Sequence, residues 1–325
     1  MRPSAAAAVL TEDFTAALAH RTDLAPLPAL DRLDTDRARR VLAGTELLVT
    51  GWGCPPLDET VLAAAPALRA VVHTAGSVKD FVTDALFRRG IAVTSAAAAN
   101  AVPVAEYALA VILLHGKRFR QAVRTYRATR SREAWSADPA LGNNGRTVGL
   151  VSASLVGRRL LELLRHHDFR LLLHDPYLSP EEAAALGARL VPLETLFAES
   201  DVVSLHTPLL PATRGLVDAA LLARMRPGAL LLNTARGAVV DGPALTEALL
   251  AGRIQAVLDV TDPEPLPPEH PLWECDDVLL TPHIAGSLGN ELSRLTDLAL
   301  QEVDNWRAGR GFAHPVEQER LAFLA

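Results

Sequence analysis

Hydrophobic and polar positions alternate along this chain with two periods. From Thr147 onward, short runs rich in Val and Leu are separated by segments whose apolar residues recur every three or four positions. Continuous apolar strands separated by helices are typical of a parallel sheet that is covered on both faces. The pattern predicts strands at 147–152, 170–174, 201–206, 229–234, 256–261 and 277–281, and helices at 155–167, 179–187, 193–199, 216–224 and 243–251.

The first hundred residues show the same alternation in shorter pieces. Strands are predicted at 6–9, 46–50, 69–74 and 91–95, and helices at 12–20 and 58–65, which together indicate a small α/β unit. A long helical pattern then starts at Pro103, a residue that suits the first turn of a helix, and continues to about residue 130. A last helix is predicted at 288–308.

Length and composition narrow the class of protein. A chain of 325 residues is long for one hydrophobic core, so we expect two domains, and 49% hydrophobic with 22% charged residues is ordinary for a soluble globular protein. The net charge of −6, without a basic patch, predicts no nucleic-acid partner. Cys54 and Cys275 match no metal or redox spacing, so we expect separate thiols and no metal site. The apolar stretch 1–10 is too short for a signal peptide and no uncharged stretch reaches membrane-spanning length, so we expect a cytoplasmic protein without a membrane partner.

The stretch VGLVSASLVG, 148 to 157, has the strand–turn–helix layout of a dinucleotide-binding loop. Ser152 and Ser154 stand where the G-x-G-x-x-G fingerprint has its first two glycines, and Gly157 matches the third. Asp175 closes the next strand, close to the separation at which a carboxylate accepts from the adenosine ribose hydroxyls. Taken alone, this loop leaves three interpretations open: a cofactor loop that tolerates serines, a loop that has lost its cofactor, or a plain turn.

Three further clusters of polar residues follow predicted strands. Arg236 lies in NTARGAVVD at 233–241, Asp259 and Glu264 lie in LDVTDPEPLPPEHPLW at 258–273, and His283 lies in LLTPHIAGS at 279–287. Arginine can donate two hydrogen bonds to one carboxylate, and a carboxylate beside an imidazole orients the ring for general acid catalysis. A surface arginine and a structural histidine are the ordinary alternatives for each residue by itself, but three such clusters at strand ends favour a catalytic site.

Taken in order and spacing, these motifs resemble the D-isomer-specific 2-hydroxyacid dehydrogenases. The resemblance covers nearly the whole chain and includes NAVPVAEYAL at 100–109 and SLHTPLLPATRGLVD at 204–218. It implies an α/β fold with a doubly wound parallel-sheet (Rossmann) NAD-binding domain at 103–287. That domain would be inserted in a smaller, flavodoxin-like α/β substrate-binding domain made of 1–102 and 288–325.

The resemblance also implies a role for individual residues. Arg236 would bind the substrate carboxylate and carbonyl oxygen, His283 would protonate that oxygen, and Glu264 would pair with His283. Asp259 would hold the nicotinamide carboxamide, and Asp175 the adenosine ribose. The other implied cofactor contacts are Ser154, Leu155, Val156, Gly157, Thr207, Pro208, Thr234, Ala235 and Gly286, and the implied substrate contacts besides Arg236 are Ala75, Gly76 and Ser77 of the loop HTAGS.

The predicted function is therefore an NAD(H)-dependent oxidoreductase that interconverts a small 2-oxoacid and its D-2-hydroxyacid. Asp175 favours NAD(H) over NADP(H), because a carboxylate repels a 2′-phosphate, while His174, Arg158 and Arg159 weaken that preference. The alternative is a catalytically weak or inactive NADH-sensing or regulatory protein on the same fold, since two glycines of the phosphate loop are replaced by serine.

Two narrower predictions follow from the resemblance. Formate dehydrogenase activity is disfavoured because the matching position there is glutamine and here it is Glu264, and a phosphorylated substrate is disfavoured because only Lys79 is basic near the HTAGS loop. The helical segment 103–130, with Trp135 beyond it, matches the dimerisation element of the family, so we expect a homodimer.

Overall fold

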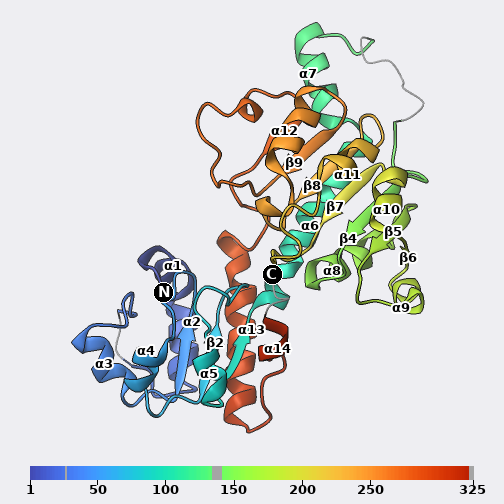
Figure 1. Cartoon of the computed structure of the whole chain (residues 1–325). Helices are drawn as coiled ribbons and strands as arrows, with labels where there is room; N and C mark the ends of the chain where they lie inside the picture. The colour runs from blue at the N-terminus through green and yellow to red at the C-terminus, as the bar shows by residue number, and fades with distance from the viewer. Residues whose placement is uncertain (26–27, 134–140, 322–325) are drawn as a thin grey trace. The chain divides into compact units, whose positions relative to one another are not determined.

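The computed structural model describes residues 1–25, 28–133 and 141–321 (Figure 1). The chain forms two compact units. Unit 1 comprises Met1–Asn100 and Ser287–Ala325, and unit 2 comprises Ala101–Gly286. The chain therefore crosses between the units at 100/101 and 286/287. The sequence predicted these boundaries at 102/103 and 287/288, which is one or two residues later.

Unit 2 is built on a parallel sheet in which seven strands of the described residues have the order β10-β9-β8-β7-β4-β5-β6. The strands are β4 (Thr147–Val151), β5 (Arg170–His174), β6 (Arg189–Leu190), β7 (Val202–Leu205), β8 (Leu230–Asn233), β9 (Gln255–Leu258) and β10 (Val278–Leu280). The connecting helices are α6 (Ala97–Gly116), which begins in unit 1, α7 (Phe119–Thr129), α8 (Leu155–Leu164), α9 (Pro180–Ala185), α10 (Leu193–Glu199), α11 (Ala219–Arg224) and α12 (Gly242–Leu250), with 3-10 turns η1 (Gly237–Val239) and η2 (Pro271–Trp273). The first strand of unit 2, β4, lies between β5 and β7, as the first strand does in the Rossmann fold. The predicted fold class is confirmed.

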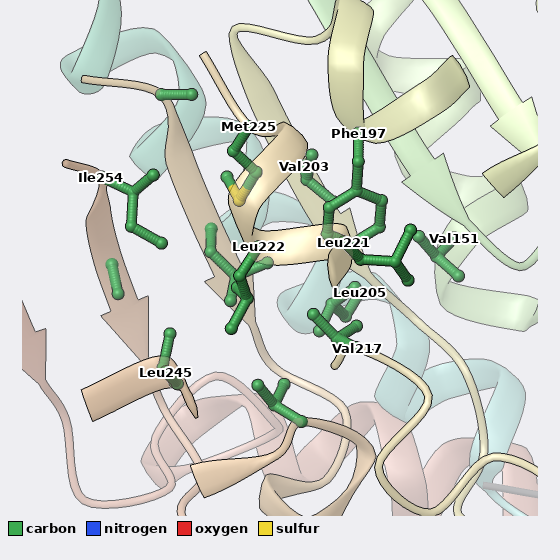
Figure 2. Packing of buried hydrophobic residues seen from close by; sticks show 14 of the residues in the cluster. Val151, Phe197, Val203, Leu205, Val217, Leu221, Leu222, Met225, Leu245 and Ile254 are labelled. Atoms are coloured by element: carbon green, nitrogen blue, oxygen red, sulfur yellow. The ribbon is translucent and has the colours of Figure 1, made fainter. Parts of the chain in front are cut away.

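Both faces of this sheet are buried, which explains the continuous apolar strands. Figure 2 shows one face, where Phe197 of α10 and Leu221 and Leu222 of α11 pack over Val203 and Leu205 of β7. Phe197, Val203 and Leu205 are completely buried. Burying one such side chain stabilises the fold by about 1.5–3 kcal/mol. The rigid sheet that results fixes where each strand ends.

Helix α6 covers part of the other face together with α8. Its Ala105, Ala108 and Ile112 pack in one cluster with Leu160 and Leu164 of α8. Among the described helices, α6 is long and apolar enough by length and composition to cross a membrane, a span that the sequence did not predict. About a third of that stretch (33%) is buried inside the structure, and these buried side chains cover the sheet as the apolar face of a core helix does.

The prediction of one helix from Pro103 to about 130 is wrong at two points. Helix α6 begins at Ala97 and ends at Gly116, so Pro103 lies inside the helix, and α7 starts only after a left-handed residue, Arg118 (φ 47°). Alanine has the highest helix propensity, and the three alanines from Ala97 extend the helix back beyond the proline. Trp135, which was predicted to belong to the dimerisation element, lies outside the described residues.

Unit 1 contains a parallel sheet with strand order β1-β2-β3 in the part of the chain that is described. Its strands are β1 (Leu47–Thr50), β2 (Ala70–His73) and β3 (Ala92–Ser95). Its helices are α1 (Pro3–Val9), α2 (Glu12–Ala19), α3 (Asp36–Leu42), α4 (Glu59–Ala63), α5 (Asp84–Arg88), α13 (Leu292–Arg307) and α14 (Gln318–Leu321), with the 3-10 turn η3 (Gly289–Glu291) before α13. The strand predicted at 6–9 is wrong. Those residues belong to α1, because an alanine run that follows a proline at the first turn favours a helix.

The C-terminal segment completes unit 1. Ala299 and Val303 of α13 pack in one cluster with Val72 of β2. The buried carboxylate of Glu302 accepts hydrogen bonds from the Thr94 hydroxyl (3.2 Å) and from the backbone N–H of His314 (2.7 Å). Residues after 287 therefore belong structurally with the first hundred residues.

Candidate active site

The site residues predicted in unit 2 gather at one edge of its sheet. Strands β4, β5, β7, β8, β9 and β10 all point the same way, and the residues in question follow directly after them. In an open parallel sheet, ligands bind at the carboxyl ends of the strands where the strand order reverses. That point lies here between β4 and β7.

The predicted phosphate loop follows β4 and contains both serines of the fingerprint. Ser152 has a positive φ of 81°, a conformation that glycine adopts without strain. Its hydroxyl lies 3.4 Å from Asp175 Oδ2, so it is directed at that carboxylate. A Cβ on Gly157 would lie 2.2 Å from the carbonyl oxygen of Ser152, so only glycine allows α8 to approach the loop this closely. The first position tolerates serine, and the third requires glycine.

Ser154 is the N-cap residue of α8. Its hydroxyl accepts a hydrogen bond from the Gly157 N–H at 3.3 Å. The N–H groups of Leu155 and Val156 precede the first complete helical turn, so no carbonyl of α8 can accept them. Together with the positive end of the helix dipole, these donors suit an anion. The residues at this loop therefore fit the pyrophosphate of a dinucleotide.

Asp175 is held in place by the backbone around it. Its Oδ2 accepts from the Ala153 N–H at 2.8 Å, and its Oδ1 accepts from the Tyr177 N–H at 2.9 Å. Each carboxylate oxygen can accept a further hydrogen bond. The carboxylate is thus oriented and still able to take a hydroxyl.

Thr207 joins the two central strands at their carboxyl ends. Its hydroxyl donates to the Val151 carbonyl at 3.2 Å, and the neighbouring Pro208 is half-buried. His206 is buried next to it, its Nε2 2.9 Å from the Ser204 hydroxyl. Burial lowers the pKa of His206 to about 4, so this ring is neutral at pH 7 and packs as an uncharged group next to Thr207.

Asn233 stabilises the turn that carries Arg236, a role that the sequence did not predict for this residue. Its Oδ1 accepts from the Ala235 N–H at 3.0 Å, and its Nδ2 donates to the Arg236 carbonyl at 2.9 Å. A Cβ on Gly237 would lie 2.0 Å from the Thr261 carbonyl carbon, so glycine brings this turn against the loop that carries Glu264. The Thr234 hydroxyl is buried without a hydrogen-bond partner within the described residues, which fits a ligand polar group at this position.

His283 and Glu264 form a hydrogen-bonded pair at the same edge. His283 Nδ1 lies 2.8 Å from Glu264 Oε1, and both side chains are about half exposed. The loop of Glu264 is anchored by buried Leu266 and by a hydrogen bond of 2.7 Å from the Thr261 hydroxyl to the Pro263 carbonyl. With Nδ1 bound to the carboxylate, Nε2 is the ring nitrogen that can face a substrate.

Asp259, only 2% exposed, organises the loop that carries His283. Its carboxylate accepts from the N–H groups of Ile284 (2.8 Å) and Ala285 (2.9 Å) and from the Thr281 hydroxyl (2.6 Å). Gly286 follows as the last residue of unit 2. Thr281 lies inside a quoted motif, but nothing in its spacing identified it as part of the site.

The predicted substrate loop lies in unit 1, directly after β2. Ala75 is buried and its carbonyl accepts from the Ala96 N–H at 3.0 Å, while Gly76 and Ser77 are partly exposed. The Ser77 hydroxyl accepts from the Lys79 N–H at 3.4 Å. Burial lowers the pKa of the adjacent His73 to about 4, so a neutral ring supports this loop.

The family model described as "D-isomer specific 2-hydroxyacid dehydrogenase, NAD binding domain" matches residues 109–285, more than half of the chain. The D-3-phosphoglycerate dehydrogenase of Mycobacterium leprae is 34% identical over 247 residues, which cover 75% of this chain and 46% of that protein. This chain thus spans about half the length of the phosphoglycerate dehydrogenases it matches. The glyoxylate reductase of Korarchaeum cryptofilum is 34% identical over 267 residues, which cover 81% of this chain and 80% of that protein.

Solved structures agree with these relatives. The apo D-mandelate dehydrogenase of Rhodotorula graminis superposes with a TM-score of 0.80 at 25% identity, over 95% of this chain and 94% of that one. The family match, the relatives and the Rossmann strand order agree with one another. The chain belongs to the D-isomer-specific 2-hydroxyacid dehydrogenase family.

Proposed function

We propose that this protein is an NAD(H)-dependent oxidoreductase that interconverts a small 2-oxoacid and its D-2-hydroxyacid. The observation that carries the proposal is the His283–Glu264 pair at 2.8 Å, on the same sheet edge as Arg236. Reduction of a ketone builds negative charge on its oxygen, so a cation and a proton donor must converge there. Arg236 and His283 supply these two groups.

Each residue has a separate task in this reaction. The bound nicotinamide cofactor would supply the hydride. Arg236 would hold the substrate through its carboxylate and its carbonyl oxygen, since a guanidinium donates two hydrogen bonds in one plane. His283 would give the proton at Nε2 to the carbonyl oxygen, while Glu264 holds Nδ1 and stabilises the protonated ring. We assign Ala75, Gly76 and Ser77 to the substrate carboxylate.

The cofactor assignment rests on Asp175 and the loop after β4. We assign the pyrophosphate to Ser154, Leu155, Val156 and Gly157, and the adenosine ribose to Asp175. Of the three basic residues that could attract a 2′-phosphate, Arg159 is paired with Glu162 at 2.6 Å and His174 Nδ1 lies 3.1 Å from the Val191 carbonyl, while Arg158 is exposed. The contacts of Arg159 and His174 support the preference for NAD(H) over NADP(H).

The remaining cofactor contacts follow the other strand ends. We assign the adenosine side to Thr207 and Pro208, and the nicotinamide side to Thr234, Ala235, Asp259 and Gly286. The buried Thr234 hydroxyl, which has no hydrogen-bond partner among the described residues, supports the second group. Asp259 Oδ1 accepts from the Ile284 N–H and the Thr281 hydroxyl, whereas Oδ2 accepts only from the Ala285 N–H among the described residues, so the carboxamide N–H would be accepted by Oδ2.

The substrate is proposed to be unphosphorylated and the assembly a cytoplasmic homodimer. In support of the dimer, α7 has no buried residue among its described positions, and Leu114 and Phe119 are 46% and 50% exposed. Such apolar exposure on neighbouring helices suits an interface between subunits. The mass in solution, measured by light scattering, tests this assembly.

The test of function separates binding from turnover. NADH and NADPH are titrated by nicotinamide fluorescence, and glyoxylate, pyruvate and hydroxypyruvate are then assayed by loss of absorbance at the nicotinamide band. Arg236→Ala should reduce kcat/KM by several orders of magnitude while the Kd of NADH stays the same, and Arg236→Lys should recover little because it lacks the planar pair of donors.

The outcomes distinguish the candidate functions. Turnover that survives Arg236→Ala would show that the arginine is misassigned. Binding of NADH without turnover on a broad panel of 2-oxoacids would favour the NADH-sensing protein, for which the serines of the phosphate loop, with Ser152 at a positive φ, are the supporting observation. Absence of binding would show that the loop has lost its cofactor.

A further inference from the structure

Three side chains connect helix α6 with the loop that carries His283. The Tyr107 hydroxyl lies 2.9 Å from Thr281 Oγ1, and Thr281 Oγ1 lies 2.6 Å from Asp259 Oδ1. Tyr107 comes from α6, Thr281 follows β10, and Asp259 follows β9. All three lie in unit 2, so this chain of contacts belongs to one compact body.

The direction of these hydrogen bonds is fixed by their acceptor. An ionised carboxylate has no proton to donate, so the Thr281 hydroxyl donates to Asp259. A hydroxyl carries one proton, so Thr281 must accept from Tyr107. Burial raises the pKa of Tyr107, and the nearby Asp259 raises it further, so the phenol stays protonated and remains the donor.

Asp259 transmits this constraint to the backbone around His283. The Asp259 carbonyl accepts from the His283 N–H at 3.0 Å, and the carboxylate accepts from the next two N–H groups, of Ile284 and Ala285. His283 itself has a positive φ of 56°. A non-glycine residue pays about 1–2 kcal/mol for that conformation. The hydrogen bonds to Asp259 offset this cost and stabilise the conformation of the loop.

The side chain of His283 depends on this backbone. The ring is 54% exposed, so packing alone does not fix its direction, and Glu264 is its hydrogen-bond partner. A change in the backbone dihedrals at His283 would turn the Cα–Cβ bond and move Nε2 away from the substrate oxygen. A misplacement of about 1 Å can lower the rate of a reaction roughly a hundredfold.

We propose that Tyr107 is a positioning residue of the active site, which holds the imidazole of His283 in its reactive orientation through Thr281 and Asp259. This inference rests on the proposed function only for its effect on turnover. The hydrogen-bond network itself can be measured in the protein without substrate. Tyr107 touches neither substrate nor cofactor in this proposal.

Four variants test the network. Tyr107→Phe removes only the donor, Thr281→Val removes the middle hydroxyl, Thr281→Ser keeps that hydroxyl and is the matched control, and Tyr107→Phe/Thr281→Val is the double variant. Tyr107→Phe should lower the single-turnover reduction rate by roughly 3- to 10-fold, and Thr281→Val by roughly 10- to 100-fold because its bond is to a charged group. The KM for the 2-oxoacid should stay unchanged, and Thr281→Ser should resemble the wild type.

The double variant separates a network from two independent effects. Once Thr281→Val has removed the link, Tyr107→Phe should cause no further loss, whereas independent sites would multiply their losses. Backbone hydrogen exchange provides the readout without substrate. Amides of residues 283–286 should exchange faster in Tyr107→Phe and Thr281→Val, while those of β4 stay unchanged.

Each outcome decides between the proposals. Unchanged exchange and unchanged rate in Tyr107→Phe would overturn the inference, and so would faster exchange with an unchanged rate, since Tyr107 would then be structural only. Multiplied losses in the double variant would also overturn it. A wild-type protein that reduces no 2-oxoacid would refute the proposed function, whereas the exchange of residues 283–286 would still support or overturn the network.

Discussion

Ser152 occupies a backbone conformation that suits glycine, so Ser152→Gly should stabilise unit 2. At a φ of 81°, a side chain costs about 1–2 kcal/mol. The larger entropy of glycine in the unfolded chain offsets about 0.4–1 kcal/mol of the gain. The lost contact to Asp175 is 3.4 Å long, so it contributes only a few tenths of a kcal/mol. The expected net gain in the free energy of unfolding is about 0.5 kcal/mol.

Ser152→Ala is the matched control, because it loses the same hydroxyl but keeps the strain. Thermal unfolding followed by circular dichroism should place the Tm of Ser152→Gly about 2–4 °C above that of Ser152→Ala, which corresponds to about 1 kcal/mol in a unit of this size. A Tm of Ser152→Ala equal to or above that of Ser152→Gly would refute the reasoning. Because the hydroxyl is directed at Asp175 and away from the start of α8, the Kd of NADH should change by less than about threefold in Ser152→Gly.

Three further predictions follow from other contacts. Ser154→Ala removes the N-cap of α8 and should lower the free energy of unfolding by about 0.5–2 kcal/mol, whereas Ser154→Gly should lower it by only a few tenths of a kcal/mol. Ser154→Gly should also tighten NADH binding if the hydroxymethyl group crowds the phosphate. Denaturant titration measures the stability, and nicotinamide fluorescence measures the Kd of NADH. Gly237→Ala would place a Cβ 2.0 Å from the Thr261 backbone, so it should destabilise the protein and slow turnover, and an unchanged kcat would show that the turn does not fix Arg236. Burial lowers the pKa of His206 to about 4, whereas a free imidazole has a pKa of about 6.5, so between these pH values the unfolded state takes up a proton that the folded state does not. The free energy of unfolding should therefore fall by up to about 1.4 kcal/mol per pH unit between pH 6.5 and 4. Urea unfolding at pH 7, 6 and 5 should show a smaller loss in His206→Gln, and equal losses in both proteins would contradict this assignment.

The sequence predicted the sheet of unit 2 well because its strands are buried on both faces. Strands such as Leu230–Asn233 and Val202–Leu205 are buried at every position and mostly apolar, and helices of the same unit carry clear signals such as the capping box of Ser179 and Glu182. Unit 1 was predicted less well. The apolar character of residues 6–9 predicts a strand, but β-branched residues favour strands and this alanine run contains none before Val9.

The side chains that we propose for catalysis could be named from the sequence because they follow strand ends in recognisable motifs. Arg236, Glu264 and His283 needed no knowledge of the tertiary structure to be named, and the structure brings Glu264 and His283 within hydrogen-bond distance. Their placement is supported by Asn233, which binds backbone groups of Ala235 and Arg236, and by Thr281, which donates to the Asp259 carboxylate. Side-chain hydrogen bonds of this kind leave no periodic pattern, so the sequence alone could not reveal them.

The two serines of the predicted phosphate loop differ in a way that the sequence alone does not reveal. By position they look equivalent, since each replaces a glycine of the fingerprint. In the structure they differ, because Ser152 has a positive φ and is directed at Asp175, whereas Ser154 caps α8, the helix start to which we assign the pyrophosphate. We therefore expect loss of the first glycine to act on the stability of the loop, and loss of the second to act on the space left for the cofactor. On this proposal, a fingerprint that departs at two positions combines two physical effects, and only the second bears directly on NADH affinity.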